Sequence, residues 1–173
     1  MSFNYDRDAD DIVTVTMDMP GRKQNVINRE FGDAMFEMIE RLEAEQDLAG
    51  VIVTSAKKDF VAGADIDMLF ALEDPEVAFD VLEQLKAGMR RLETLGSPVV
   101  AAMNGTALGG GYEVALACHH RIAVDDDRAK VGFPEVTLGL LPAGGGVSRL
   151  PRMIGLQASF PFLVEGRQVN PKR

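Results

Sequence analysis

Two glutamates in segments of small or apolar residues are the side chains best suited to acid–base chemistry in this sequence. Glu113 follows three consecutive glycines and precedes an apolar run, Val114–Ala117. Glu135 is the only charged residue between Lys130 and Arg149. An apolar setting raises the pKa of a carboxyl group, and two facing carboxyls titrate as a coupled pair. One can then hold a proton while the other accepts one, as the addition or removal of water requires.

Each glutamate also has a simpler structural explanation. Glu113 falls in the first turn of a predicted helix, where a negative charge complements the helix dipole by about 0.3–1 kcal/mol. Because its neighbours are apolar, we give a position facing a cleft about even odds against a position facing bulk water. Glu135, taken alone, is most simply an exposed loop residue. The two explanations therefore stay open at this point.

Two runs of small residues could present backbone N–H groups to a ligand. Three glycines inside a helix would each cost about 1 kcal/mol, so Gly109–Gly111 are expected at a helix N-terminus, where free N–H groups face a ligand. The Gly-Lys-Ser/Thr ending of a P-loop is absent, and a carbonyl oxygen that gains negative charge fits better. The other run, 60–66, either places the backbone of Ala62–Ala64 against a ligand or is a tight connection in which Asp65 caps a helix.

An alternation of strands and helices must position these segments. Short apolar runs predict strands at 12–17, 51–53, 98–103, 121–124 and 130–133. Apolar spacing and helix-start residues predict helices at 29–45, 76–95, from the three glycines to 118, and 155–164. A further glycine triplet, Gly144–Gly146, opens a turn or short helix before Arg149. This order predicts an α/β fold with largely parallel strand pairing.

Composition excludes several other classes of protein. The 173 residues carry 18 basic and 27 acidic side chains, a net charge of −9, which argues against a non-specific nucleic-acid binder but not against a phosphate-bearing ligand. A single cysteine, Cys118, forms no internal disulfide, and it is expected in the core. With only His119 and His120, expected to be structural or surface residues, a metal site is not predicted. The absence of a signal-like start over Met1–Asp11 and of a long apolar run predicts a cytoplasmic protein without a membrane span.

Taken in order, three segments of the chain resemble the crotonase (enoyl-CoA hydratase/isomerase) superfamily. These segments are 60–66, 104–113 and 133–142, and the similarity extends from 12 to 164. Within the superfamily the sequence is most similar to the hydratase region of multifunctional fatty-acid β-oxidation enzymes of the α-subunit type. That similarity is carried by Met17–Gly21 with Asn25–Asn28, by Asp125–Asp127, and by Gly139–Pro142 leading to Ser148–Arg152.

The resemblance implies a crotonase-like α/β fold, a spiral superhelix of ββα units. Residues 1–173 would form one incomplete domain, because the C-terminal helices of the family, which close over the acyl pocket and commonly mediate trimer contacts, would be missing. The dehydrogenase domain of the multifunctional enzymes would be missing as well. The chain is therefore expected to be a C-terminally truncated part of a homo-oligomeric protein, with a thiolase subunit as a candidate partner.

The resemblance also implies an activity, the addition of water across the 2,3-double bond of a trans-2-enoyl-CoA to give a 3-hydroxyacyl-CoA in fatty-acid β-oxidation. Glu113 and Glu135 would hold and activate the water, and the N–H groups of Ala64 and Gly110 would form an oxyanion hole. The remaining contacts to the acyl-CoA substrate would come from Val26, Ala62, Asp65 and Gly109. No metal and no cofactor is implied, because CoA is part of the substrate and NAD would serve the missing dehydrogenase domain.

Two alternatives remain beside hydration. A Δ3,Δ2-enoyl-CoA isomerase needs one carboxylate and the same oxyanion hole, and a catalytically inactive fragment would only bind acyl-CoA. The presence of both glutamates favours the hydratase. Two positions depart from the pattern of the family: Ala143 replaces a usual glycine, and Tyr112 stands where a small or apolar residue is more common. Both positions bear on acyl-chain preference and on the placement of the water.

Overall fold

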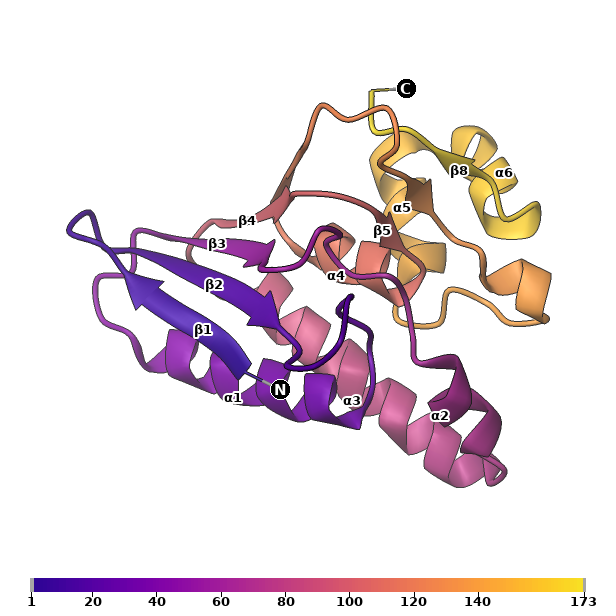
Figure 1. Ribbon diagram of the computed structural model, residues 1–173, viewed down its shortest axis with the longest axis horizontal. Helices are drawn as coiled ribbons and strands as arrows, with labels where there is room; N and C mark the ends of the chain where they lie inside the picture. The colour runs from indigo at the N-terminus through magenta and orange to yellow at the C-terminus, as the bar shows by residue number, and fades with distance from the viewer. Residues whose placement is uncertain (1, 173) are drawn as a thin grey trace.

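A twisted five-stranded sheet forms one end of the molecule in the computed structural model, which describes residues 2–172 (Figure 1). Its order is β1-β2-β3-β4-β6, with β1 antiparallel to β2 and all other neighbours parallel. The strands span Ser2–Arg7, Ile12–Asp18, Gly50–Ser55, Val99–Met103 and His120–Ala123. A second sheet, of order β5-β7-β8, combines Ala107–Leu108, Val131–Gly132 and Gln168–Val169.

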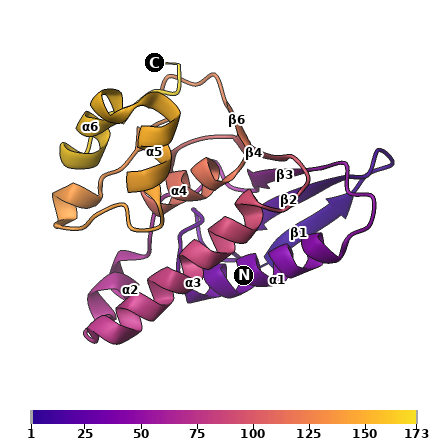
Figure 2. The same ribbon diagram turned by 180° about the vertical axis from the view of Figure 1, so that it is seen from behind.

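Two long helices lie together along one face of the five-stranded sheet, below it in Figure 1 and again side by side in the rear view of Figure 2. They are α1 and α3, and the short α2 precedes α3 in the chain. At the other end of the molecule, α5 and α6 stand near the small sheet (Figure 1). The helices span Arg29–Ala44, Ile66–Ala71, Pro75–Glu93, Gly110–Ala117, Gly146–Ile154 and Leu156–Val164, and a 3₁₀ helix, η1, spans Glu135–Leu138.

The core forms where the alternating face of the strands meets the apolar stripes of the helices. Along β2, Val13, Val15 and Met17 are buried and the residues between them are partly exposed, as the period of a strand requires. On α1, Phe31 and Met35 are among the buried residues that recur at helical spacing. The first turn of α1 is closed by the side chain of Asn28, which accepts the N–H of Phe31.

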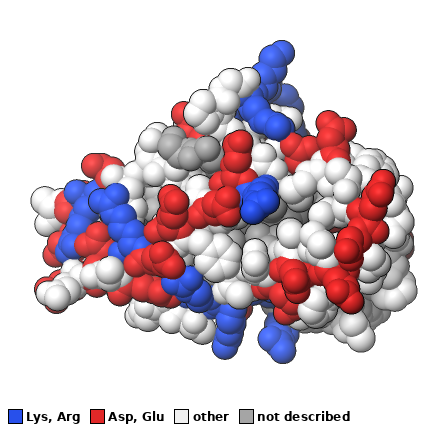
Figure 3. All heavy atoms as spheres, turned by 90° about the horizontal axis from the view of Figure 1, so that it is seen from below, with Lys and Arg blue, Asp and Glu red and all other residues white. Residues whose placement is uncertain are grey.

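Ion pairs on the helical face contribute less than this core. Figure 3 shows the underside of Figure 1, where acidic and basic side chains lie interspersed. Arg91 of α3 donates two hydrogen bonds to Glu43 of α1, at 2.7 and 3.0 Å. Exposed pairs of this kind stabilise a protein by about 0–1 kcal/mol, so apolar contacts hold the two helices together. None of the helices in residues 2–172 has the length and the apolar character needed to cross a bilayer.

The sequence prediction of alternating strands and helices is confirmed, but it missed β1, α2, η1 and the two-residue strands β5 and β8. In β1 only Phe3 and Tyr5 pack against the core, which is too little alternation to signal a strand, and β8 has two residues. No residue of α2 is buried, and its six residues are too few to show a helical period in the sequence. Asp65 does occupy the N-cap position of α2, but its side chain binds Arg22 at 2.9 Å instead of capping the helix, which corrects the capping interpretation.

A buried asparagine joins the loop before α1 to two other segments. Asn25 is 0% exposed. Its Oδ1 accepts the N–H of Met19 at 3.0 Å, and its Nδ2 donates to the Oγ of Ser55 at 2.9 Å. Its backbone carbonyl accepts the N–H of Ala62 at 2.9 Å. These bonds fix the segment that begins at Asn25 against the segment 61–65, on which part of the predicted site lies.

We expect Asn25→Ala to lower the free energy of unfolding by about 2–3 kcal/mol, because it leaves buried donors and acceptors without partners. Urea denaturation monitored by circular dichroism measures this loss. Asn28→Ala is the matched control: it removes only a helix cap, worth about 1 kcal/mol. Equal losses in the two variants would contradict the role given to Asn25.

Candidate active site

The two residues expected to form an oxyanion hole lie on neighbouring segments of the chain. Val61 and Ala107 form a parallel bridge, and the N–H of Leu108 donates to the carbonyl of Val61 at 3.2 Å. A Cβ added at Gly63 would lie 3.5 Å from the carbonyl of Leu108. A Cβ added at Gly110 would lie 2.7 Å from the Cδ1 of Ile27, the residue that forms a bridge with Ala64. These contacts bring the segments of Ala64 and Gly110 together, although the two residues are 46 positions apart.

The N–H of Ala64 points toward the segment that carries Gly110. On its other side, Ile27 forms a parallel bridge with Ala64, and it bonds the carbonyl of Gly63 at 2.8 Å and the N–H of Asp65 at 2.9 Å. In a parallel pair the residue between two such bonds turns its own N–H and carbonyl to the opposite side. The N–H of Ala64 has no hydrogen-bond acceptor among residues 2–172.

The glycines before α4 give its N-terminus a shape that other residues would not allow. Gly109 has a φ of +53°, which favours glycine. A Cβ added at Gly111 would collide with the backbone of Val61. Gly110 is the first residue of α4, where an N–H has no partner inside the helix. No other group among the described residues accepts this N–H, so it is open to a ligand.

Glu113, one turn into α4, is only 3% exposed. Its Oε1 accepts the N–H of Gly146 at 2.7 Å. Its Oε2 lies against Gly144, where an added Cβ would be 2.6 Å away. Burial raises the pKa of Glu113, while the N–H groups of the Gly144–Gly146 turn and the charge of Arg149 oppose the rise. The carboxyl is thus buried but supplied with hydrogen-bond donors.

Glu135, the first residue of η1, approaches the same end of α4. A Cβ added at Gly109 would lie 2.6 Å from its Oε1, and its Oε2 is buried with no hydrogen-bond partner in residues 2–172. Burial is the main cause that raises the pKa of Glu135 to about 7; its own backbone N–H opposes the rise and the charge of Glu113 adds to it. The side chain is therefore not the exposed loop residue of the simpler explanation.

The two carboxyls flank neighbouring residues of the chain. Glu135 lies against Gly109, and an added Cβ at Gly110 would be 3.8 Å from the Oε2 of Glu113. The structure therefore brings together two acids of raised pKa and the open N–H groups of Ala64 and Gly110. Such a site can move protons and stabilise an oxyanion.

The residues expected to bind the rest of the substrate occupy two places. Val26 and Ala62 are both half-buried and lie on adjacent segments, joined by the hydrogen bond from the N–H of Ala62 to the carbonyl before Val26. Asp65 lies three residues beyond Ala62 and pairs with Arg22. Gly109 lies against the carboxyl of Glu135. Roles in substrate binding for these four residues remain predictions.

The sequence model of the family described as enoyl-CoA hydratase/isomerase matches residues 7–173. The chain belongs to this family. It is 44% identical to the fatty acid oxidation complex subunit alpha of Shewanella frigidimarina and 45% identical to that of Shewanella loihica. Both alignments cover 99% of this chain but 24% of the relative, so the chain spans about a quarter of the length of these curated relatives.

Solved structures with the same fold come from the same family. Enoyl-CoA hydratases from Bacillus anthracis and Thermoplasma volcanium each match with a TM-score of 0.89, at 31% and 30% identity. The alignments cover 99% of this chain, and 66% and 67% of those chains. The crotonase-like fold expected from the sequence is confirmed.

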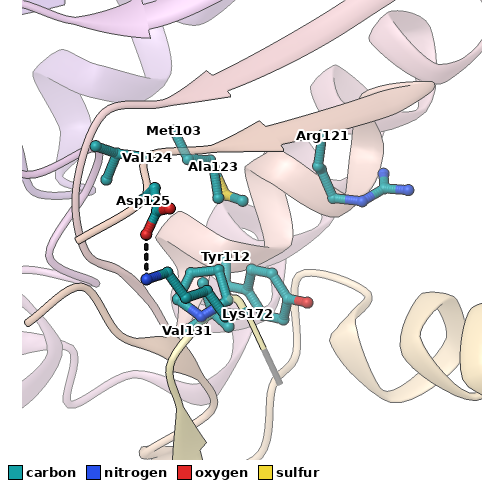
Figure 4. Close-up of a pocket in the computed structure, with 9 residues that line it drawn as sticks. Met103, Tyr112, Arg121, Ala123, Val124, Asp125, Val131 and Lys172 are labelled. Carbon is teal, nitrogen blue, oxygen red and sulfur yellow. Dashed lines mark ion pairs between the residues drawn. The ribbon is translucent and has the colours of Figure 1, made fainter. Parts of the chain in front are cut away.

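A separate cavity of about 380 Å³ lies beside Tyr112 and is lined by neither glutamate. Figure 4 shows Arg121 and Tyr112 at this cavity, with an ion pair between Asp125 and Lys172 across it. The ring of Tyr112 also packs against Phe133, with ring centroids 5.3 Å apart. Tyr112 thus precedes Glu113 in the helix but contacts a different region, because successive helical residues point about 100° apart.

The cysteine and the first histidine have the structural roles predicted for them. Cys118 is buried, and burial raises the pKa of its thiol to about 12. The Nδ1 of His119 accepts the N–H of Val99 at 2.9 Å, which joins the end of α4 to β4. Within the described part of the chain, no group of three or more His, Cys, Asp or Glu side chains could hold a metal ion.

Sequence reasoning missed the partner of Glu113. The Gly144–Gly146 triplet was predicted only as a turn or short helix, yet its N–H groups donate hydrogen bonds to the buried carboxyl. The available signal was the triplet itself: a second run of glycines before a short helix, matching the run before Glu113.

We expect Glu135→Gln to stabilise the protein more at pH 8 than at pH 5. The carboxyl has a pKa of about 7 in the folded state and an ordinary value of 4.5. The folded state therefore binds more protons between these values, and stability falls as the pH rises from about 4.5 to about 7. The neutral amide of the glutamine variant does not titrate, so it does not lose stability over this pH range.

Urea unfolding at the two pH values tests this expectation. Glu76→Gln, in the first turn of α3 and exposed, is the charge-matched control. A difference between Glu135→Gln and the unmodified protein that is the same at both pH values would contradict it.

Proposed function

We propose that this chain carries the active site of an enoyl-CoA hydratase, which converts a trans-2-enoyl-CoA into a 3-hydroxyacyl-CoA in fatty-acid oxidation. The observation that carries the proposal is the placement of two carboxyls of raised pKa at one helix N-terminus, beside open N–H groups. Membership of the family and the names of the solved relatives support it. Residues 1–173 would act as a single domain in this reaction.

Glu113 is suited to act as the base and Glu135 as the acid. The backbone N–H groups of the Gly144–Gly146 turn and the charge of Arg149 favour the ionised form of Glu113. Glu135 is opposed only by its own backbone N–H, and at a pKa of about 7 it holds its proton in a large share of molecules at neutral pH. Different surroundings thus give two identical side chains different roles.

Water addition then proceeds with all atoms accounted for. Glu113 takes a proton from the water, and the water oxygen forms a bond to C3 of the enoyl group. The 2,3 π electrons move toward the thioester, whose oxygen gains negative charge. As the thioester carbonyl re-forms, the carbon at position 2 takes the proton of Glu135. The proton held by Glu113 then passes through a water to Glu135, which returns both side chains to their starting forms. No electron donor or acceptor is needed.

The thioester oxygen is expected between the N–H groups of Ala64 and Gly110. These donors are fixed by the backbone, so they need no rearrangement when the charge develops. Val26 and Ala62, on adjacent half-buried segments, would line the groove for CoA, with Asp65 and Gly109 as further contacts.

Glu113→Gln and Glu135→Gln should each lower kcat for hydration of crotonyl-CoA by about 10²–10⁴-fold, because each removes one proton-transfer group. The assay follows the loss of absorbance of the conjugated enoyl thioester, with Glu76→Gln as control. Full activity in either variant would contradict the proposal. Conversion of a 3-enoyl-CoA without hydration of crotonyl-CoA would indicate an isomerase, and binding of acyl-CoA without turnover an inactive fragment.

Gly110→Pro should lower kcat by about 10²–10³-fold relative to Gly110→Ala, as expected for one lost oxyanion donor. Proline lacks the N–H and is tolerated at the first position of a helix. Alanine keeps the N–H, while its Cβ meets the same flexible end of Ile27. Equal activities of the two variants would exclude the N–H of Gly110 as a donor.

Assembly and location form a separate part of the proposal. The parent protein is proposed to be a cytoplasmic homo-oligomer that joins a thiolase subunit. The names of the curated relatives, alpha subunits of a complex, support a multi-subunit assembly. Large apolar side chains of α5 and α6 are exposed, including Met153, Leu156 and Phe160, and they would be covered in such an assembly.

A further inference from the structure

Arg149, on α5, connects the end of α3 with the Gly144–Gly146 turn, whose N–H groups bond Glu113. Its Nη1 donates to the carbonyl of Gly144 at 2.9 Å. Its Nε and Nη2 donate to the two carboxylate oxygens of Glu93 at 3.3 and 3.4 Å. The side chain of Arg149 is 13% exposed, so its charge is largely removed from water. All three nitrogen atoms of the guanidinium are therefore in use.

The guanidinium and Glu113 hold the same turn from two sides. Gly145, in the middle, has a φ of +118°, and a Cβ added there would collide with the Nη1 of Arg149. The carbonyl of Gly144 accepts a hydrogen bond from Arg149. On the side where a Cβ would stand, Gly144 packs against the Oε2 of Glu113. Gly146 then donates its N–H to the Oε1 of Glu113. A shift of the turn would change both sets of contacts together.

The other end of this arrangement is anchored on α3. Glu93 is the last residue of that helix. Burial acts to raise the pKa of Glu93, but hydrogen bonds from Arg90 and Arg149 outweigh it, so its pKa lies below the ordinary value and the side chain is charged. Met89, one turn earlier and 0% exposed, lies under Gly144, 3.3 Å from the position of an added Cβ.

We infer that Arg149 is a positioning residue for the hydratase reaction, holding the Gly144–Gly146 turn so that its N–H groups meet Glu113. The inference rests on the proposed function. It requires arginine and not merely a positive charge, because the planar fork binds the carboxylate of Glu93 and the carbonyl of Gly144 at once. Lysine has one nitrogen and cannot make this set of contacts in the same geometry.

The charged groups facing Glu113 come from two elements packed against α4. Arg149 of α5 lowers the pKa of Glu113, and Glu135 of η1 interacts with it unfavourably. Glu93 of α3 lies behind Arg149. Loss of the guanidinium should therefore raise the pKa of Glu113 twice over, through the lost charge and through looser N–H donors.

The first arm of the test measures that pKa by ¹³C NMR of the glutamate carboxyls, with the Glu113 signal identified by its disappearance in Glu113→Gln. Arg149→Met should shift the pKa of Glu113 upward, and Glu93→Gln should shift it in the same direction by less. Arg90→Met is the control, because Arg90 is exposed and binds Glu93 without touching the turn. Should Arg149→Met fail to fold, Glu93→Gln carries the pKa test and Arg149→Lys carries the kinetic test below.

The second arm measures hydration of crotonyl-CoA. Arg149→Met should lower kcat roughly ten- to a hundredfold, as a small misplacement of a catalytic group does. KM should change by less than about threefold, and the acidic limb of the pH profile should move upward with the pKa of Glu113. Arg149→Lys should restore much of the pKa but little of kcat.

The outcomes separate the two proposals. An unmodified protein that hydrates nothing counts against the proposed function, while the NMR arm still decides what Arg149 does to Glu113. An unchanged pKa of Glu113 in both Arg149→Met and Glu93→Gln overturns the inference. A fall in stability alone, with unchanged kcat and pKa, overturns it as well.

Discussion

The hydrogen bond from the N–H of Gly146 to the carboxylate of Glu113 is the interaction on which the site depends. A carboxylate that is 3% exposed has lost its water, and without donors it would disfavour folding or stay neutral. The bond also joins the starts of α4 and α5, two helices separated by two strands and a 3₁₀ helix. Through Arg149 the same turn reaches the end of α3. One buried charge therefore sets the relative position of three helices.

Close packing of backbone around the site explains its glycines better than chain flexibility does. Gly111 lets α4 meet the backbone of Val61, and so brings the segment of Ala64 next to the helix. Gly109 leaves room for the carboxyl of Glu135, and Gly144 for that of Glu113. Each glycine costs conformational entropy on folding, but it allows a close approach that a Cβ would block. The proposed oxyanion-hole donors and the two acids are thereby held within one small region.

Local patterns in the sequence predicted most of the elements and the two acids, because alternation, helical spacing and glycine runs are local signals. They also placed Gly109–Gly111 correctly at a helix N-terminus. The pairing of Glu113 with Gly146 escaped prediction because it joins residues 33 positions apart, and register between distant segments has no local signature. The same limit hid Arg149, whose partner Glu93 lies 56 positions earlier. Resemblance to a family supplied the roles of Ala64 and Gly110, which no composition or spacing could assign.

The two acids differ in a way that connects stability with function. Glu113 is satisfied within the chain, but the buried Oε2 of Glu135 has no hydrogen-bond partner among the described residues. An orphaned polar atom costs free energy unless a proton or a ligand satisfies it. A proton does so below a pH of about 7, and this protonated form of Glu135 is the one that the proposed reaction needs at C2. A water or substrate between the acids would do so at higher pH. The burial that lowers stability at alkaline pH is thus also what keeps a proton on Glu135 for the proposed transfer to C2.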